Sequence, residues 1–323
     1  MRCATLAELP PPPRDKSAWP WAEESPQLPD PMPDGSAWPK VSIVTPSYNQ
    51  GQFIEETIRS VLLQGYPNLE YIIIDGGSTD NSVEIIRKYE PWLAHWVSEP
   101  DRGQGHAINK GLRVSSGQVM NWLNSDDCFK PGALPHVIAY FRSNGAAQVL
   151  CGFRQVFRGH RMSRITSVRA YLKPDRYTLS RCCYIAQETT FWKRSVWATI
   201  GQLDETFQFA LDYDYWQRIL AAGYRFCLLP CFLGLFRAHL HSKGTRQQDT
   251  RTRELARIYW RYLGTTKSEE QLRLEISPAW WRRMRLMHML GRVGLLNSPT
   301  LAKAAVSALS LKEDEIPHSN PVG

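Results

Sequence analysis

The sequence predicts an α/β protein with a mostly parallel sheet, followed by a helical C-terminal region. Residues 41–46 and 69–75 are short apolar runs, which is typical of strands that are covered on both faces of a parallel sheet. Between them, residues 52–64 place apolar side chains at i, i+4, i+7 and i+8, the spacing of one helix face. A strand, a helix and a strand in this order indicate a βαβ unit.

The same alternation continues along the chain, bounded by glycine, proline and polar turn residues. The further expected elements are strands over 94–97, 118–123, 149–157 and 187–192 and helices over 82–89, 104–114 and 212–222. We therefore expect one globular domain over residues 40–250. Residues 251–323 follow as a mostly helical region.

Residues 1–39 form a separate segment, rich in proline and containing three tryptophans. Such a composition disfavours both helix and sheet, so the segment is an extended arm or a linker. Its tryptophans could attach it to the globular body, and plain disorder is the alternative. Near the other end, residues 279–296 interleave arginines with tryptophan, methionine and leucine. This helix could lie on an anionic membrane, or it packs on the core with its arginines in solvent.

The composition restricts the class of protein. Lys and Arg number 39 against 31 Asp and Glu, a net charge of +8 that favours acidic ligands without indicating nucleic acid. The apolar run 226–236 is too short to cross a membrane and is broken by Pro230. The N-terminus lacks the apolar core of a secretory signal, and the seven cysteines contain no CxxC pair. We expect a cytoplasmic protein.

Polar residues follow four consecutive predicted strands, at 45–49, 75–80, 98–104 and 124–127. In open parallel sheets, ligands bind outside the carboxyl ends of the strands. Four polar strand ends at one edge therefore predict a ligand crevice. No G-x-G-x-x-G or G-x-x-x-x-G-K-[ST] motif is present, which argues against NAD-dependent and P-loop enzymes.

Three aspartates at these strand ends are candidate binding residues. Asp75 follows three isoleucines, so its carboxylate needs a hydrogen-bond partner, such as a nucleobase or a ribose; a helix N-cap role is the alternative. Asp126 and Asp127 are adjacent carboxylates whose repulsion a hard divalent cation, Mg²⁺ or Mn²⁺, would relieve. Because neighbouring strand residues point in opposite directions, one of the pair could face a ribose and the other the metal.

Residues 40–241 resemble the family 2 glycosyltransferases, which have the GT-A fold. The matching segments, in the family's order, are 41–50, 72–82, 98–103, 107–111, 122–127 and 211–216. The resemblance implies a Rossmann-like nucleotide-binding half over 40–130 and an acceptor half over 131–250. It also implies an inverting transfer of a sugar, from a nucleoside-diphosphate sugar to a hydroxyl acceptor, in cell-surface polysaccharide or glycan synthesis. We favour a UDP-sugar donor, a glycan or lipid-linked acceptor and a Mn²⁺ or Mg²⁺ cofactor.

The resemblance also assigns roles to individual residues. Asp75 would contact the nucleotide base, Asp126 the ribose and Asp127 the divalent metal. His239 would reach the metal or the diphosphate. The other residues expected to bind the nucleotide-sugar are Thr45, Pro46, Tyr48, Asn49, Arg102, Arg237 and Lys243. Residues 187–192 should line the acceptor side.

Asp212 is the candidate general base that removes the proton from the acceptor hydroxyl. It is the first aspartate of 211–216, at the start of a predicted helix whose dipole would help keep it ionised. Leu211 stands where relatives often have an acidic residue, which weakens this assignment slightly. Asp214 would point elsewhere on the helix and have a structural role.

Two other functions remain open. A nucleotidyltransferase would need a glycine-rich, basic loop after the first strand, and residues 45–49 contain neither glycine nor a cation. A non-catalytic protein with the same fold would bind nucleotide or sugar without transferring it. The basic C-terminal helix suggests work at the cytosolic face of a membrane, on a lipid-linked glycan.

Overall fold

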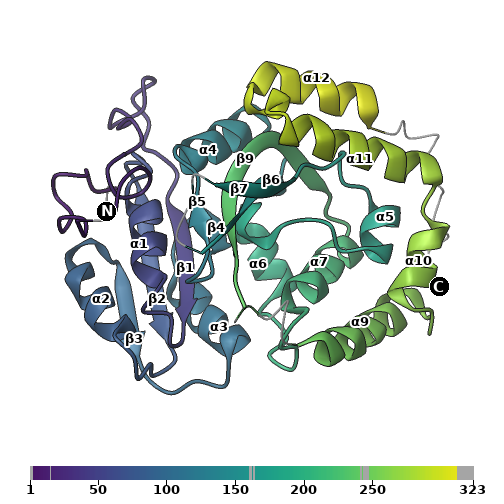
Figure 1. The fold of residues 1–323 in the computed structure, drawn as a ribbon, viewed down its shortest axis with the longest axis horizontal. Helices are drawn as coiled ribbons and strands as arrows, with labels where there is room; N and C mark the ends of the chain where they lie inside the picture. Colours follow the sequence, from purple (N-terminus) through teal and green to yellow (C-terminus); the bar gives the residue numbers. More distant parts are fainter. Residues whose placement is uncertain are drawn as a thin grey trace.

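The computed structural model describes residues 3–14, 16–159, 162, 164–240, 242 and 247–310. In its first half, strands and helices alternate as the sequence predicts (Figure 1). The elements are β1 (Val41–Ser47), α1 (Ile54–Leu62), β2 (Leu69–Asp75), α2 (Ser82–Lys88), η1 (Glu90–Trp92), β3 (His95–Ser98), α3 (Gln104–Val114) and β4 (Val119–Trp122).

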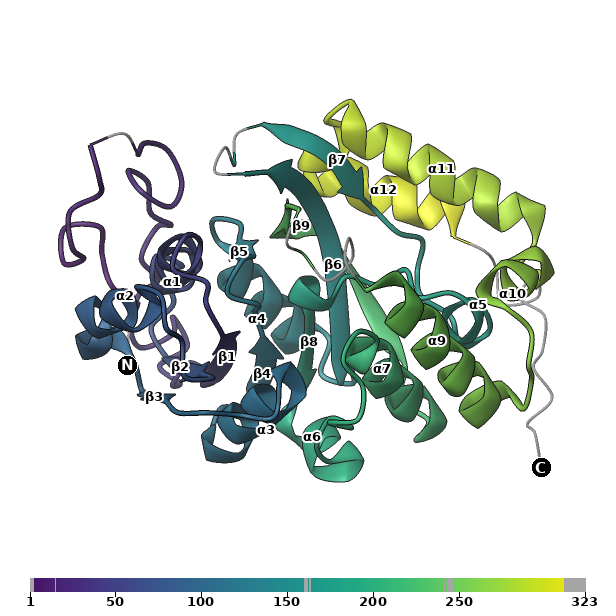
Figure 2. The same cartoon turned by 60° about the horizontal axis from the view of Figure 1, so that its bottom comes forward.

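The second half is less regular and ends in a group of helices. Its elements are β5 (Cys128–Phe129), α4 (Ala133–Ser143), β6 (Val149–Arg158), β7 (Ile165–Arg169), α5 (Arg176–Arg181), η2 (Gln187–Thr189), β8 (Thr190–Lys193), α6 (Arg194–Ile200), α7 (Leu211–Ala221) and β9 (Phe226–Ala238). The last helices are α9 (Gln248–Leu263), α10 (Glu269–Glu275), α11 (Pro278–Arg292), η3 (Leu295–Asn297) and α12 (Pro299–Leu309). They lie on the side of the sheet away from β1, β2 and β3 (Figure 2).

The strands form one sheet in the order β3-β2-β1-β4-β8-β6-β9-β5, with β7 paired to β6. The strands from β3 to β4 are all parallel, whereas β8 is antiparallel to both of its neighbours. The α/β fold class and the C-terminal helices are thus confirmed, but the sheet is mixed rather than mostly parallel. Sequence reasoning missed β9, because it considered the run 226–236 only as a candidate membrane segment.

The register of the parallel strands brings their carboxyl ends to one edge of the sheet. Ser47 at the end of β1 lies opposite Asp75, and Asp75 lies opposite Ser98. Helix α3 packs closely on this part of the sheet, because a Cβ atom on Gly111 would lie 2.3 Å from Cγ1 of Val44. Only glycine permits this approach, which explains its place in the segment 107–111.

The described part of the N-terminal arm packs against α1 and its surroundings. Trp19 and Trp21 are 7% and 4% exposed, and Nε1 of Trp19 donates a hydrogen bond of 2.9 Å to the carbonyl of Phe129. The guanidinium of Arg59 lies 5.0 Å from the centre of the Trp21 ring, and its Nε donates to the carbonyl of Pro20. The tryptophans therefore attach the arm to the globular body, the first of the two alternatives.

Helix α11 packs on the core rather than standing free. Trp280, Met284 and Met287 are buried, whereas Arg282 and Arg285 are exposed. One face of this helix is thus already covered by protein. In the part of the chain that the structure describes, no helix has both the length and the apolar character that a membrane span requires.

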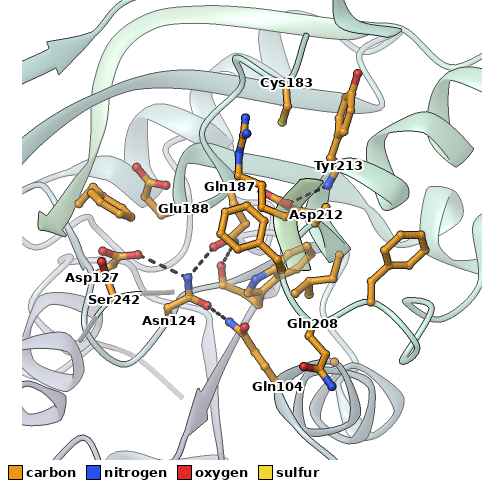
Figure 3. A pocket seen from close by; sticks show the side chains of 18 of the residues that line it. Gln104, Asn124, Asp127, Cys183, Gln187, Glu188, Gln208, Asp212, Tyr213 and Ser242 are labelled. Atoms are coloured by element: carbon orange, nitrogen blue, oxygen red, sulfur yellow. Dashed lines mark hydrogen bonds between the residues drawn. The ribbon is translucent and has the colours of Figure 1, made fainter. Parts of the chain in front are cut away.

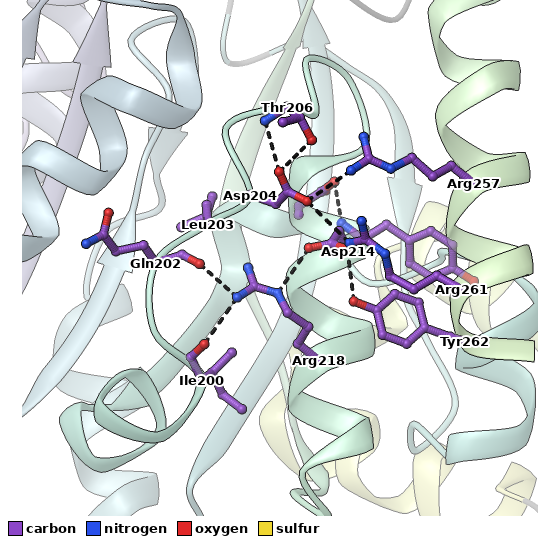
Figure 4. A network of polar contacts seen from close by, with 12 residues as sticks. Ile200, Gln202, Leu203, Asp204, Thr206, Asp214, Arg218, Arg257, Arg261 and Tyr262 are labelled. Atoms are coloured by element: carbon purple, nitrogen blue, oxygen red, sulfur yellow. Dashed lines mark hydrogen bonds and ion pairs between the residues drawn. The ribbon is translucent and has the colours of Figure 1, made fainter. Parts of the chain in front are cut away.

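Asp214 in α7 belongs to a buried polar network that joins α7 to α9 (Figure 4). Its side chain is fully buried and forms ion pairs with Nε of Arg218 and Nη1 of Arg261, each at 3.0 Å. The hydroxyl of Tyr262 donates a third bond to it at 3.0 Å. Asp214 therefore holds two helices together, in agreement with its expected structural role.

We expect Asp214→Ala to lower the free energy of unfolding by about 3 kcal/mol, because two arginines would lose their buried counter-charge. The exposed Asp249 in the first turn of α9 is a control. Asp249→Ala should cost only about 0.5 kcal/mol. Urea unfolding of both variants measures the difference, and equal losses would contradict this role of Asp214.

Candidate active site

A cavity of about 1600 Å³ opens at the carboxyl ends of the parallel strands. All four segments that the sequence predicts to form a crevice contribute to its wall. The contributing residues from these segments are Pro46, Ser47, Tyr48, Gly76, Gly77, Pro100, Asp101, Arg102, Gly103, Gln104, Asn124, Ser125, Asp126 and Asp127. The cavity extends past β6, η2 and α7 to helices α9, α10 and α11.

The turn after β4 holds Asp126 and Asp127 in different directions. Oδ2 of Asp126 lies 2.9 Å from Nε2 of His239. Asp127 is 1% exposed, and its Oδ1 accepts a hydrogen bond of 3.0 Å from the backbone N–H of Arg237. The hydroxyl of Thr57 donates to the backbone carbonyl of Asp127 at 2.7 Å, which fixes the turn against α1. The two carboxylates thus diverge as expected, but the turn sets their directions rather than strand alternation, because β4 ends at Trp122.

Burial raises the pKa of Asp127 well above its usual value, and the charges of Asp126 and Glu188 raise it further. An ionised Asp127 is therefore costly without a compensating cation. Carboxylate oxygens suit Mg²⁺ and Mn²⁺. Among the described residues, no three His, Cys, Asp or Glu side chains converge as a complete ligand set. Such a metal would thus depend on one or two carboxylates and on oxygens of a bound ligand, which is usual for Mg²⁺.

Asn124 connects the two sides of the cavity (Figure 3). Its Oδ1 accepts a hydrogen bond of 2.6 Å from Gln104 at the start of α3. Its Nδ2 lies 3.5 Å from Oδ2 of Asp127 and 3.3 Å from Oε1 of Gln187. The nucleotide-side loops and the η2 turn are therefore joined directly.

Asp212 lies at the start of α7 and faces the same cavity (Figure 3). Its Oδ1 accepts a hydrogen bond of 2.8 Å from the backbone N–H of Tyr213. Burial raises the pKa of Asp212 to about 6, although that bond and the positive charge of Arg154 oppose the rise. A carboxylate with such a pKa is ionised at pH 7 and remains basic enough to accept a proton.

Sequence reasoning missed the ion pair of Arg154 with Glu188, whose charges act on both Asp127 and Asp212. Nη1 of Arg154 in β6 lies 3.5 Å from Oε2 of Glu188, and both residues line the cavity. The Arg154 guanidinium also lies over the ring of Phe236, 4.5 Å from its centre. A charged residue inside the apolar run 149–157 was the available signal for Arg154. Glu188 stood in the segment 187–192, which was placed on the acceptor side without a role of its own.

Asp75 already has protein partners. It accepts hydrogen bonds from the backbone N–H groups of Gly77 and Ser78 and from the hydroxyls of Ser78 and Ser98. Its side chain is fully buried and does not line the cavity, whereas the neighbouring Gly76 and Gly77 do. The structure thus shows Asp75 ordering the loop after β2, which is close to the alternative of a capping role.

Thr45 in β1 and Asn49 in the loop after it are also placed away from the cavity wall. The Thr45 hydroxyl is buried, 3.1 Å from that of Tyr71. Asn49 has a positive φ of 51°, and its Oδ1 accepts a hydrogen bond of 2.8 Å from the backbone N–H of Thr79. Asn49 therefore joins the loops after β1 and β2. Pro46 and the exposed Tyr48 line the cavity, as expected.

Arg237 was expected to bind the nucleotide-sugar, but its side chain does not line the cavity. It is fully buried, pairs with Oε2 of Glu56 at 2.5 Å and lies between the rings of Phe53 and Phe157. Alternation along β9 turns Phe236 toward the cavity and Arg237 to the other face. Its Nε donates to the backbone carbonyl of Asp126 at 2.8 Å, so it supports the turn after β4 from the side opposite the cavity.

The remaining expected residues have different surroundings. His239 is held by Asp126 and by the ring of Phe53, at 4.8 Å between ring centres, and is not part of the cavity wall. Arg102 lines the cavity with 70% of its side chain exposed and pairs with Glu205 at 2.7 Å. Lys243 lies outside the described residues.

Comparison with known proteins finds a family match for one part of the chain that lines this cavity. Residues 42–193 match the family model "Glycosyl transferase family 2". This match extends from β1 to β8. It therefore includes the turn that holds Asp126 and Asp127 and the η2 turn, and it ends before Asp212.

Three relatives of this chain are also named as glycosyltransferases. An uncharacterized glycosyltransferase of Rickettsia typhi is 28% identical over 56% of this chain and 58% of its own length. A second, from Mycobacterium tuberculosis, is 31% identical over 54% of this chain and 66% of its own length. The putative teichuronic acid biosynthesis glycosyltransferase TuaG of Bacillus subtilis is 36% identical over 35% of this chain and 46% of its own. The chain thus spans between about half and two thirds of these relatives.

Two solved structures share the fold. The S. aureus protein TarS (residues 1–349), in complex with UDP-GlcNAc, has a TM-score of 0.54 and 18% identity, covering 84% of each chain. The mannosyltransferase PcManGT from Pyrobaculum calidifontis, in complex with GDP-Man and Mn²⁺, has a TM-score of 0.54 and 19% identity. That match covers 89% of this chain and 78% of the other. Both likenesses support the GT-A type of α/β fold.

Proposed function

We propose that the protein transfers a sugar from a nucleoside-diphosphate sugar, favouring a UDP-sugar, to a hydroxyl of a glycan or lipid-linked acceptor. The observation that carries this proposal is one cavity lined by Asp126 and Asp127, which lie in the part of the chain that matches the family 2 model, and by Asp212 of α7. The reaction would serve cell-surface glycan synthesis, by analogy with TuaG.

In the proposed reaction, Asp212 accepts the proton of the acceptor hydroxyl while that oxygen forms a bond to the anomeric carbon of the donor. The bond from this carbon to the diphosphate breaks on the opposite side, so the configuration inverts and the nucleoside diphosphate leaves. The N–H of Tyr213 orients the Asp212 carboxylate, and the charge of Arg154 favours its ionised form.

The donor would bind at the other acidic residues of the cavity, Asp126 and Asp127. Asp127 would hold Mn²⁺ or Mg²⁺, Asp126 would face the ribose, and the loop ordered by Asp75 would approach the base through Gly76 and Gly77. The residues fit a divalent cation, since Asp127 is buried beside Asp126 and Glu188. When bound, the ion supplies positive charge to the diphosphate as the leaving group becomes more negative.

A direct test incubates the protein with Mn²⁺, an oligosaccharide acceptor mixture and UDP-glucose, UDP-GlcNAc or GDP-mannose in turn. We expect one donor to release nucleoside diphosphate and to yield a product of inverted anomeric configuration in the ¹H NMR spectrum. Retention of configuration would exclude the single-displacement role of Asp212. Unchanged nucleotide-sugar in every mixture would contradict the proposed activity.

The pH dependence of kcat/KM follows from the pKa of Asp212, about 6. The base must be ionised, so the rate should fall tenfold per pH unit below about pH 6 and become level above about pH 7. A pH series with donor and acceptor below saturation measures this limb. If the base were a solvent-exposed aspartate, kcat/KM would begin to fall only near pH 4. A rate that does not fall between pH 7 and pH 5 would contradict a base of this pKa.

We also propose a peripheral contact between the exposed side of α11 and α12 and an anionic membrane. The exposed arginines Arg282 and Arg292 and the exposed Met289 and Leu301 support this contact. Flotation with vesicles of phosphatidylcholine and phosphatidylglycerol should recover the wild-type protein. The double variant Arg282→Glu, Arg292→Glu should float less, and equal recovery of both proteins would contradict the contact.

A further inference from the structure

The charged residues divide the cavity into two chemically different ends. The end near β4 and α7 is lined by Asp126, Asp127, Glu188 and Asp212, together with Arg154, which pairs with Glu188. The other end is formed by β7 and the helices α9, α10 and α11. The charged groups that line it are Arg169, Arg251, Arg273, Arg285 and Glu269. Four guanidinium groups and one carboxylate leave this basic end with a net charge of +3.

The one carboxylate is already shared. Glu269 pairs with Arg251, and its Oε1 lies 3.8 Å from Nη1 of Arg273. Within the described residues, neither Arg169 nor Arg285 forms an ion pair, and both are exposed. The basic end therefore has more positive charge than its own acidic residues can balance.

The neighbouring histidine does not reduce this charge. Burial lowers the pKa of His288 to about 4, and the positive charge of Arg169 acts in the same direction. His288 is thus neutral at pH 7, while its Nε2 is buried without a hydrogen-bond partner among the described residues and the residue lines the cavity. A neutral imidazole nitrogen beside the arginines can donate to, or accept from, a ligand hydroxyl.

An aromatic side chain lies next to the arginines. The guanidinium of Arg273 stands over the ring of Trp281, 4.6 Å from its centre, and Nε1 of Trp281 donates to the carbonyl of Arg273 at 3.2 Å. Trp281 is therefore held in place, and it lines the cavity together with Met284. A fixed indole plane beside cations can pack against the apolar face of a sugar while the arginines bind its anionic groups.

The size of the cavity leaves room for a second ligand. Sites for ligands of drug size are typically about 300–1000 Å³, whereas this cavity measures about 1600 Å³. A nucleotide-sugar at the acidic end would thus leave the basic end open. Asp212 lines the same continuous cavity, so a ligand at the basic end can direct a hydroxyl toward it.

We propose that the basic end binds the acceptor, and that the acceptor is an anionic glycan carrying phosphate or carboxylate groups. This inference rests on the proposed function, since it assigns the acceptor part of the same cavity. Arginine suits both anions, because its planar fork donates two parallel hydrogen bonds to either.

Calorimetric titration of the full chain, with and without UDP and Mn²⁺, tests the inference with three oligosaccharide probes. These are neutral maltotetraose, phosphorylated maltotetraose and tetragalacturonate, which separate phosphate from carboxylate. We expect at least one anionic probe to bind about tenfold more tightly than maltotetraose. Arg169→Ala and Arg285→Ala should each weaken its binding about fivefold, because each removes a guanidinium without an internal ion pair.

Arg253→Ala is the matched control, because Arg253 is exposed on α9, the same helix as the cavity-lining Arg251, and does not line the cavity. It should bind the anionic probes like the wild type. Equal affinity for neutral and anionic probes, no binding of either anionic probe, or wild-type affinity in Arg285→Ala would each overturn the inference. A thermal shift with UDP and Mn²⁺ on the same proteins reports donor binding separately. Its absence, with anionic probes still bound, would count against the proposed transfer reaction.

Discussion

Asp212→Asn is expected to lower kcat/KM for sugar transfer by about 10³-fold while nucleotide binding stays normal. Asparagine has the shape of aspartate and can still accept the hydrogen bond from the N–H of Tyr213, so α7 should keep its structure. It cannot accept a proton from the acceptor hydroxyl. Release of nucleoside diphosphate in the presence of acceptor measures the rate, and nucleotide binding is followed by thermal shift.

Asp249→Asn is the matched control, since Asp249 also stands in the first turn of a helix and lies outside the cavity wall. It should transfer sugar at the wild-type rate. If Asp212→Asn transfers as fast as this control, Asp212 is not the base. If the wild-type protein binds nucleotide but transfers nothing, the non-catalytic alternative becomes the better account.

Asp127→Asn should weaken Mn²⁺-dependent nucleotide binding about 100-fold, because it removes the carboxylate that is placed to hold the cation. Without metal, the variant should be no less stable than the wild type. Burial and the charges of Asp126 and Glu188 raise the pKa of Asp127, so its ionised form is a cost to the folded state. The amide oxygen can still accept the hydrogen bond from the N–H of Arg237.

Two measurements separate these effects. Titration of UDP in the presence of Mn²⁺ gives the loss of binding, and urea unfolding in EDTA gives the metal-free stability. Asp249→Asn again serves as the control: it should leave the binding of UDP unchanged and lower the stability by no more than about 0.5 kcal/mol. Wild-type affinity for UDP and Mn²⁺ in Asp127→Asn would contradict the metal site.

The parts of the site that follow from local pattern could be predicted from sequence. Asp126 and Asp127 lie in the turn after β4, which is parallel to β1, and the carboxyl ends of parallel strands meet at one edge. Gly76 and Gly77 reach the cavity for the same reason. The βαβ order required only apolar periodicity and turn residues, which are local signals.

The parts that depend on distant pairing could not be predicted. The direction of Arg237 is set by the pairing of β9 with β6 and β5 and by Glu56, which lies 181 residues earlier in the sequence. The pair of Arg154 and Glu188 forms only when β6 and η2 pack together. The hydrogen bond from the hydroxyl of Ser98 to Asp75 also comes from the next strand of the sheet, whereas the bonds from Gly77 and Ser78 are local and could have been expected.

The central claim is that the acidic end of the cavity binds a nucleoside diphosphate together with a divalent cation. A thermal-shift screen of UDP, GDP, dTDP and CMP with Mn²⁺, each beside an EDTA control, tests it most directly. At a hundredfold excess over Kd, one nucleoside diphosphate should add about 2.7 kcal/mol and raise Tm by about 5 °C, and EDTA should abolish the rise. No shift with any nucleotide, or an equal shift in EDTA, would contradict the claim.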